Sequence, residues 1–252
     1  MSVPANAHPI ERAFIRRPVA SAVAATVAFV ALTGGLRAAF TVIIPDGAHQ
    51  DQVAAGMQQL VLALITVGVI ARVGWLRSAR ITSRPRWPRS RWALTILPAA
   101  IIPLVGLGAV DWSQTAQIGA SSFDFLTTGL VEEVMCRSFI MTGLAIGFRG
   151  RSSATLRVVL WSSLLFGLAH LNPVVVVFAA VFGFSFAHLA LAANTIWIGV
   201  VVHGAFDLFT DLPDSTNGNT HWSIAPALAI VVAGGIVAVL RARKPEIEFQ
   251  SQ

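Results

Sequence analysis

The chain has 252 residues, of which 55% are hydrophobic and only 12% are charged. A soluble domain carries about 25% charged residues. This composition therefore excludes an ordinary soluble globular protein and predicts an all-α membrane protein with several spans. The pI near 11.3 does not indicate a nucleic-acid binder, because the basic residues are distributed between the hydrophobic segments.

Eight apolar segments could cross a bilayer, which takes about 17 to 25 residues per helix. They lie near 19–44, 53–75, 92–110, 123–148, 154–171, 174–192, 195–210 and 223–240. No internal repeat divides them, so we expect residues 1–252 to form a single transmembrane domain, a bundle of about eight helices. The first span is too long for the hydrophobic part of a cleavable signal, and we expect none.

The basic residues, all arginine except Lys244, gather in four clusters: Arg12/Arg16/Arg17, Arg72 to Arg91, Arg149/Arg151/Arg157 and Arg241/Arg243/Lys244. With eight spans, all four clusters lie on one side, and the loops on the other side carry aspartates. This is the positive-inside pattern, which predicts cytoplasmic N- and C-termini and a basic cytoplasmic loop at 77–91. Arg37 is an exception that we expect to reach the outer interface. Anionic lipids are the expected partners of the basic loops.

Two adjacent carboxylates, Glu132 and Glu133, stand inside the fourth hydrophobic segment. An ionised side chain there costs at least about 2.5 to 3.5 kcal/mol, so the pair indicates a functional site. Glu133 and Arg137 are four residues apart, share a helix face and can form an ion pair. Glu132 points about 100° away from Glu133. It has no local partner, which makes it the candidate general base. Alternatively, Glu132 could make a structural polar contact with another helix.

Two further segments carry histidines. Phe166 and His170 share a face at the end of the fifth span, where the following Asn172-Pro173 should end the helix. His203 and Asp207 share a face of the seventh span, and a nearby carboxylate can fix an imidazole ring. Taken singly, His170 is typical of an interfacial residue, and His203 with Asp207 could simply join two helices.

The single cysteine, Cys136, excludes an internal disulfide and is expected to be a buried apolar filler. His188, in the sixth span, is expected to be a buried, hydrogen-bonded histidine, and its role stays open.

Together these segments resemble the CAAX protease and bacteriocin-processing (Abi) family of intramembrane proteases, related to the Ras-converting CAAX endopeptidase. That family is recognised by E-E-x-x-x-R, F-x-x-x-H and H-x-x-x-N/D on successive helices. The matching stretches here run from Glu132 to Arg137, from Phe166 to His170, and from His203 to Asp207. The resemblance covers a catalytic core of about 120–210. The last motif ends in Asp207, where the best-understood members carry Asn.

The resemblance implies a glutamate-type endopeptidase that needs no cofactor. Glu132, helped by His170, would deprotonate a water molecule that attacks a peptide carbonyl. His203, held by Asp207, would stabilise the oxyanion. Glu133 and Arg137 would be structural support, with Glu133 pointing away from the cavity toward Arg137.

Two alternatives remain. A zinc-dependent intramembrane protease could use Glu132, His170, His203 and Asp207 as ligands, although the H-E-x-x-H motif is absent. A non-enzymatic transporter or scaffold could use the same residues as a proton relay. The expected substrate is a membrane-associated peptide or protein. The chain itself is expected to be a multi-pass protein of a prokaryotic plasma membrane. The sequence does not indicate to which side the site opens.

Overall fold

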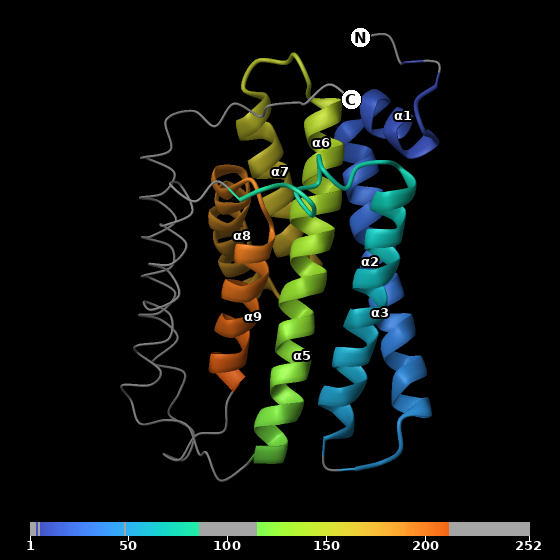
Figure 1. Ribbon diagram of the computed structural model, residues 1–252, viewed down its shortest axis with the longest axis vertical. Helices are drawn as coiled ribbons and strands as arrows, with labels where there is room; N and C mark the ends of the chain where they lie inside the picture. The colour runs from blue at the N-terminus through green and yellow to red at the C-terminus, as the bar shows by residue number, and fades with distance from the viewer. Residues whose placement is uncertain (1–3, 5, 48, 86–114, 212–252) are drawn as a thin grey trace.

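The computed structural model describes residues 4, 6–47, 49–85 and 115–211, and these residues form helices and turns with no strand (Figure 1). The all-α class is therefore confirmed for this part of the chain. The helices are α1 (Pro9–Arg16), α2 (Pro18–Ile43), α3 (Gln50–Arg72), α5 (Thr115–Glu133), η1 (Val134–Ile140), α6 (Met141–Gly147), α7 (Ala154–Ala169), α8 (Pro173–Ala193) and α9 (Trp197–Asp211). The expected spans 92–110 and 223–240, the cluster 241–244 and positions 86–91 of the basic loop lie outside the described residues.

Within the described part of the chain, three helices are long and apolar enough to cross a membrane: α2, α3 and residues Val175–Ala193 of α8. They coincide within a few residues with the spans expected at 19–44, 53–75 and 174–192. Two shorter apolar helices, α7 and the Trp197–Leu208 part of α9, occupy the segments expected at 154–171 and 195–210. The chain is a membrane protein, while the number of eight spans stays a prediction.

The fourth hydrophobic segment is longer than its hydropathy suggested. It was expected at 123–148, but helix begins at Thr115 and continues through α5, η1 and α6 to Gly147. The added stretch, residues 115–122, is polar enough to escape a hydropathy criterion although it is helical. At about 1.5 Å per residue, Glu132 lies about 26 Å from the start of this helix.

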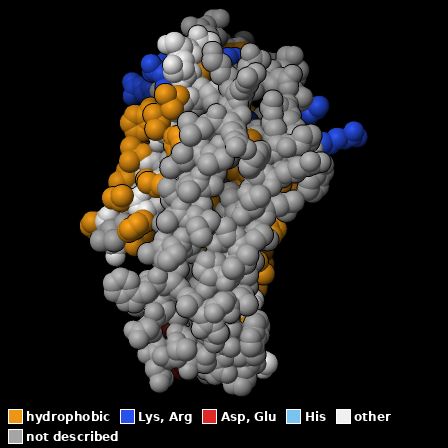
Figure 2. Space-filling view, turned by 90° about the vertical axis from the view of Figure 1, so that its left-hand side faces the viewer, with side chains coloured by type: hydrophobic (Ala, Val, Ile, Leu, Met, Phe, Trp, Pro, Cys, Tyr) orange, Lys and Arg blue, Asp and Glu red, His pale blue; other side chains and the backbone are white. Residues whose placement is uncertain are grey.

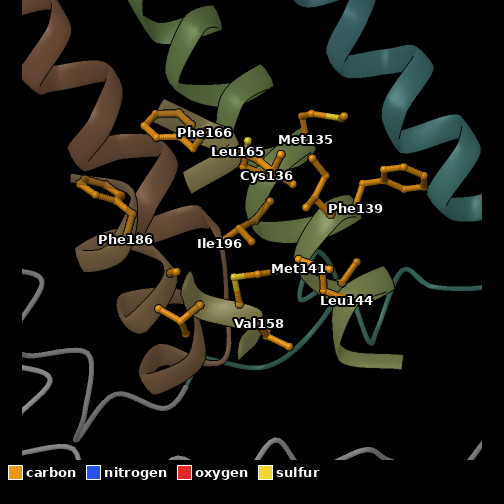
Figure 3. Packing of buried hydrophobic residues seen from close by; sticks show 14 of the residues in the cluster. Met135, Cys136, Phe139, Met141, Leu144, Val158, Leu165, Phe166, Phe186 and Ile196 are labelled. Atoms are coloured by element: carbon orange, nitrogen blue, oxygen red, sulfur yellow. The ribbon is translucent and has the colours of Figure 1, made fainter. Parts of the chain in front are cut away.

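The middle of this long helix, η1, is a π-helix in which every residue is buried. Around it lies the main hydrophobic core, to which η1, α6, α7 and α8 all contribute (Figure 3). Phe139 of η1 packs against Trp75 and Phe14, with ring centroids 5.9 Å apart in both pairs. The E-E-x-x-x-R motif that begins at Glu132 therefore continues directly into a fully buried helix segment.

Phe14 belongs to α1, a short helix that hydropathy did not predict. Arg12 and Arg16 on its outer face are exposed, whereas Phe14 is buried. A Cβ atom at Gly143 would come within 2.5 Å of the Phe14 ring, so α6 needs a glycine where α1 packs on it. One buried aromatic side chain thus anchors a short helix that also carries three charged residues.

The two ends of the bundle differ in charge. Helix α1, the loop after α3 and the α6–α7 connection lie at one end, and the α2–α3 connection lies at the other (Figure 1). Exposed arginines of the three described clusters gather at the first end, which we call the arginine end, and hydrophobic side chains follow on the flank (Figure 2).

Candidate active site

Close packing of α5 against α9 brings the acidic pair to the histidine. A Cβ atom at Gly129 would lie 2.5 Å from the backbone nitrogen of Gly204 and 2.9 Å from the carbonyl oxygen of Val200. Small residues of this kind allow the backbones of two membrane helices to approach closely. The contact lies one turn before Glu132 and Glu133 on α5, and directly after His203 on α9.

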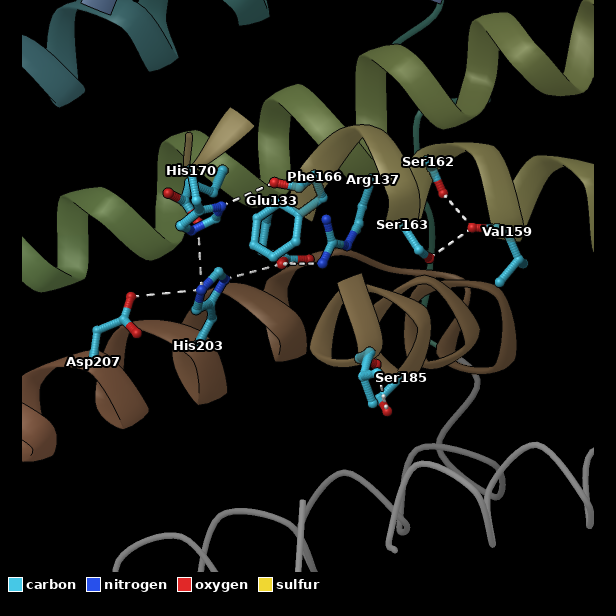
Figure 4. Close-up of polar contacts among 12 residues, drawn as sticks. Glu133, Arg137, Val159, Ser162, Ser163, Phe166, His170, Ser185, His203 and Asp207 are labelled. Carbon is cyan, nitrogen blue, oxygen red and sulfur yellow. Dashed lines mark hydrogen bonds and ion pairs between the residues drawn. The ribbon is translucent and has the colours of Figure 1, made fainter. Parts of the chain in front are cut away.

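His203 is the centre of the site, and three carboxylates contact its ring (Figure 4). Its Nδ1 lies 3.1 Å from Oε1 of Glu133. Its Nε2 lies 3.5 Å from Oε2 of Glu132 and 3.5 Å from Oδ2 of Asp207. Since an ionised carboxylate only accepts hydrogen bonds, the Nδ1–H donates to Glu133, and this bond directs Nε2 toward the other two carboxylates.

Glu133 therefore has two partners, where the sequence predicted one. Its Oε1 lies 3.5 Å from Nη2 of Arg137, as the spacing predicted. The expectation that Glu133 points away from the site was wrong, because the same oxygen accepts the bond from His203. Gly199 of α9 makes this approach possible, since a Cβ atom there would lie 2.8 Å from Oε2 of Glu133. Two adjacent helix positions, Glu132 and Glu133, thus contact the two nitrogens of one ring.

Arg137 is enclosed by aromatic rings. Its side chain is only 1% exposed, and its guanidinium carbon lies 4.4 Å from the ring centroid of Phe166 and 6.0 Å from that of Phe186. A guanidinium at this distance from an aromatic face is attracted by the electron-rich ring. The cation is thus held by one carboxylate and by π-systems of α7 and α8.

His170 ends α7, as its C-cap residue. Its Nδ1 lies 2.9 Å from the carbonyl oxygen of Phe166. A carbonyl only accepts, so Nδ1 donates, and Nε2 is the acceptor in the neutral ring. The Phe166 ring contacts both His170 and His203, at centroid distances of 5.0 and 5.8 Å. His170 also interacts electrostatically with Asp207, but no hydrogen bond in the described part of the chain joins it directly to Glu132 or His203.

The aromatic surroundings of His203 were not foreseen. Phe182 and Phe186 of α8 lie 5.2 and 5.3 Å from its ring, and Phe182 also contacts Phe206. The alternating phenylalanines of that segment were visible in the sequence, but helix α8 does not reveal by itself which of them faces the site. Phe184 points elsewhere and packs on His188 at 4.8 Å. His188 was expected to be hydrogen-bonded, but its Nδ1 is buried without a hydrogen-bond partner.

Cys136 is buried and free, as expected of an apolar filler. Among the residues that the structure describes, no three His, Cys, Asp or Glu side chains are arranged to hold a metal ion. The zinc-ligand set Glu132, His170, His203 and Asp207 does converge on one region, with Glu132 and Asp207 both directed at Nε2 of His203.

Residues 114–209 match the family model described as Type II CAAX prenyl endopeptidase Rce1-like. Over this range the chain is similar to the CAAX proteases. All three motifs, and every contact of His203 described above, lie inside the matched range. No curated protein and no solved structure matches the chain. The matched region therefore comprises α5 to α9, and α1 to α3 pack outside it.

Proposed function

We propose that this protein is an intramembrane endopeptidase in which Glu132 activates a water molecule to hydrolyse a peptide bond of a membrane-associated peptide or protein. The observation that carries the proposal is the contact of one buried imidazole, His203, with three carboxylates from two helices. The family match over the same residues supports a protease rather than a transporter or scaffold.

Glu132 is the proposed base because its carboxylate lies close to His203 and is partly exposed. Its side chain is 22% exposed, whereas that of Glu133 is fully buried. The first carboxylate is therefore accessible from outside the packed helices, and the second is not. Glu132 takes a proton from the water, whose oxygen forms the new bond to the peptide carbonyl carbon. The proton then passes to the leaving amine as the peptide bond breaks.

His203 is the proposed oxyanion donor, and Glu133 is the residue that orients it. The Nδ1–H bond to Glu133 fixes the ring so that Nε2 faces Glu132 and Asp207. With a peptide carbonyl in place, the Nε2–H would donate to the developing oxyanion, a contribution of about 3 to 4 kcal/mol per donor. This role for Glu133 replaces the orientation by Asp207 that the sequence suggested. Asp207 and Glu132 instead both contact Nε2 of His203, so these three side chains would exchange protons as a coupled group.

His170 is the proposed second proton-handling residue. Its Nδ1–H is engaged by the Phe166 carbonyl, so its Nε2 is available to accept a proton from water or to pass one on. Arg137 would balance the charge of Glu133.

We further propose that the reaction needs no metal ion, which separates it from the zinc-dependent alternative. The proposed role of Glu132 supports this, because a carboxylate that takes the proton of water directly needs no metal-bound water. Treatment of purified protein with a strong chelator, followed by metal analysis, should leave the cleavage rate unchanged and the protein free of stoichiometric zinc. Loss of cleavage that added zinc restores would contradict a metal-free mechanism.

The expected setting is the plasma membrane of a prokaryote, with the arginine end in the cytoplasm and against anionic lipids. The substrate would be a membrane-tethered peptide or precursor. Membrane-protein fragments should be compared in cells that express the wild type, Glu132→Gln or the control Glu11→Gln, which removes a carboxylate of α1 far from the site. Fragments present with the wild type and Glu11→Gln, but absent with Glu132→Gln, would identify the substrate. Identical fragment patterns in all three would contradict the proposal.

A further inference from the structure

The burial of the site changes along the axis of the bundle. Toward the arginine end, Glu133, Arg137 and all of η1 are buried. Away from it, Glu132 and Asp207 are 22% and 23% exposed. Side chains on a helix point toward its N-terminus. Helix α5 runs toward the arginine end, so the Glu132 side chain tilts away from that end (Figure 1). Helix α9 runs the opposite way and places Asp207 one turn farther from the arginine end than His203. The approach is therefore closed on the arginine side and accessible on the other.

A polar stripe continues from Glu132 in that direction. Asp124, Thr128 and Glu132 are each four residues apart on α5 and therefore follow one face. All three are partly exposed, whereas Thr127 and Gly129 between them are buried. At about 1.5 Å per residue the stripe is about 12 Å long.

The stripe is also tied to α3. Nε2 of Gln59 donates to Oδ1 of Asp124 at 3.1 Å, in a contact that crosses from α3 to α5. An ionisable residue in a membrane-embedded helix, paired across helices, indicates an ion or water pathway by default. The mechanism described above uses neither Asp124 nor Thr128.

The α7–α8 turn lies on the same side of the site. Phe166, near the end of α7, contacts both His170 and His203 (Figure 4), and Leu171 and Asn172 follow His170 at once. Leu171 is 75% exposed and has a positive φ of 58°. Helices α2, α3 and α5 continue well past this turn, to the far end of the bundle (Figure 1). Non-helical backbone at membrane depth is tolerated where it is buried in protein or lines a water-filled space, and Leu171 is not buried.

We infer that water and substrate reach Glu132 from the end opposite the arginine end, along an aqueous path lined by the α5 stripe and the α7–α8 turn. The inference rests on the proposed function, and it narrows the substrate class. With the arginine end in the cytoplasm, the cleaved bond would belong to an extracytoplasmic or membrane-embedded segment of the substrate, beyond the outer end of the path.

The single cysteine of the chain allows a direct test. In a Cys136→Ala background, Leu171→Cys would be exposed to a charged, membrane-impermeant maleimide in sealed spheroplasts and in inverted membrane vesicles. Thr128→Cys is a second probe inside the stripe. Ser152→Cys, exposed in the α6–α7 connection at the arginine end, reports the opposite side. Val177→Cys, 63% exposed on the apolar helix α8, reports a lipid-facing position.

We expect Leu171→Cys and Thr128→Cys to be labelled in spheroplasts, Ser152→Cys only in inverted vesicles, and Val177→Cys in neither. Labelling of Leu171→Cys from the same side as Ser152→Cys would overturn the inference, as would its failure to react from both sides. Labelling does not require turnover. An inactive protein that is labelled as predicted would therefore contradict the proposed function alone, and an active protein labelled from the wrong side would contradict only the path.

Discussion

Phe166 shows most clearly how single residues shape the site. Its ring contacts His170, His203 and the guanidinium of Arg137, and its carbonyl fixes the tautomer of His170. The F-x-x-x-H spacing thus has a physical basis, because Phe166 contacts three residues of the site at once. The sequence pointed to Phe166 only as a neighbour of His170, since its other two contacts come from different helices.

We expect Phe166→Leu to lower the cleavage rate markedly while costing only a few kcal/mol of stability. Each aromatic contact contributes about 0.5 to 1.5 kcal/mol beyond its buried area, and the rings it positions carry the chemistry. Phe184→Leu is the matched control, since Phe184 contacts His188 rather than the site. Cleavage rates and detergent melts of the two variants would be compared. Equal cleavage rates for the two variants would show that Phe166 is only a packing residue of the hydrophobic core.

The double role of Glu133 leads to a second prediction. Arg137→Met leaves a buried charge without its partner, which typically costs about 3 to 5 kcal/mol, so it should mainly lower the melting temperature. Glu133→Gln should lower both the melting temperature and the cleavage rate, because Glu133 also orients His203. The double variant should recover part of the stability but not the rate.

Thermal melts and cleavage assays on the two single variants and the double variant separate these effects. Additive losses of stability would mean that Glu133 and Arg137 are not paired. Full activity in a folded Glu133→Gln protein would mean that Glu133 does not direct His203.

Among the helices, η1 and the glycine contact between α5 and α9 determine the geometry. Helical periodicity predicted that Glu133 and Arg137 share a face, but it assumed a regular α-helix and could not predict the π-helix. Nor could it show that Gly129 and Gly204 meet, because the pairing of two helices depends on their packing. The motif residues were predictable from the sequence, whereas the position of Glu133 beside His203 was not.

We expect Gly129→Ala to reduce cleavage strongly. The added methyl would lie 2.5 Å from a backbone nitrogen of α9, so the helices must separate and His203 must move away from the carboxylates. Gly119→Ala on the same helix is the matched control, with no atom within 4 Å of the new methyl. Its greater helix propensity should leave stability unchanged or raise it by up to about 1 kcal/mol. Cleavage by Gly129→Ala at the wild-type rate would contradict the close-packing account.

For the whole molecule, composition and hydropathy predicted the helical membrane class and placed α2, α3 and α8 within a few residues. They missed α1, in which Phe14 is the buried residue, and the first turns of α5, which are polar. Both errors have one cause, since hydropathy detects contact with lipid and not packing against protein. The eight-span topology and its orientation remain predictions, consistent with the exposed arginines of the three described clusters at one end (Figure 2).

The central claim is that Glu132 is the base of a peptide hydrolysis. The most direct measurement is the cleavage of an identified substrate by purified protein in liposomes, for the wild type, Glu132→Gln and Glu11→Gln. Glutamine keeps the shape of the side chain but cannot take a proton, so Glu132→Gln should be inactive while remaining inserted and monodisperse. Glu11→Gln should match the wild type. Cleavage by a well-folded Glu132→Gln protein at the wild-type rate would contradict the account.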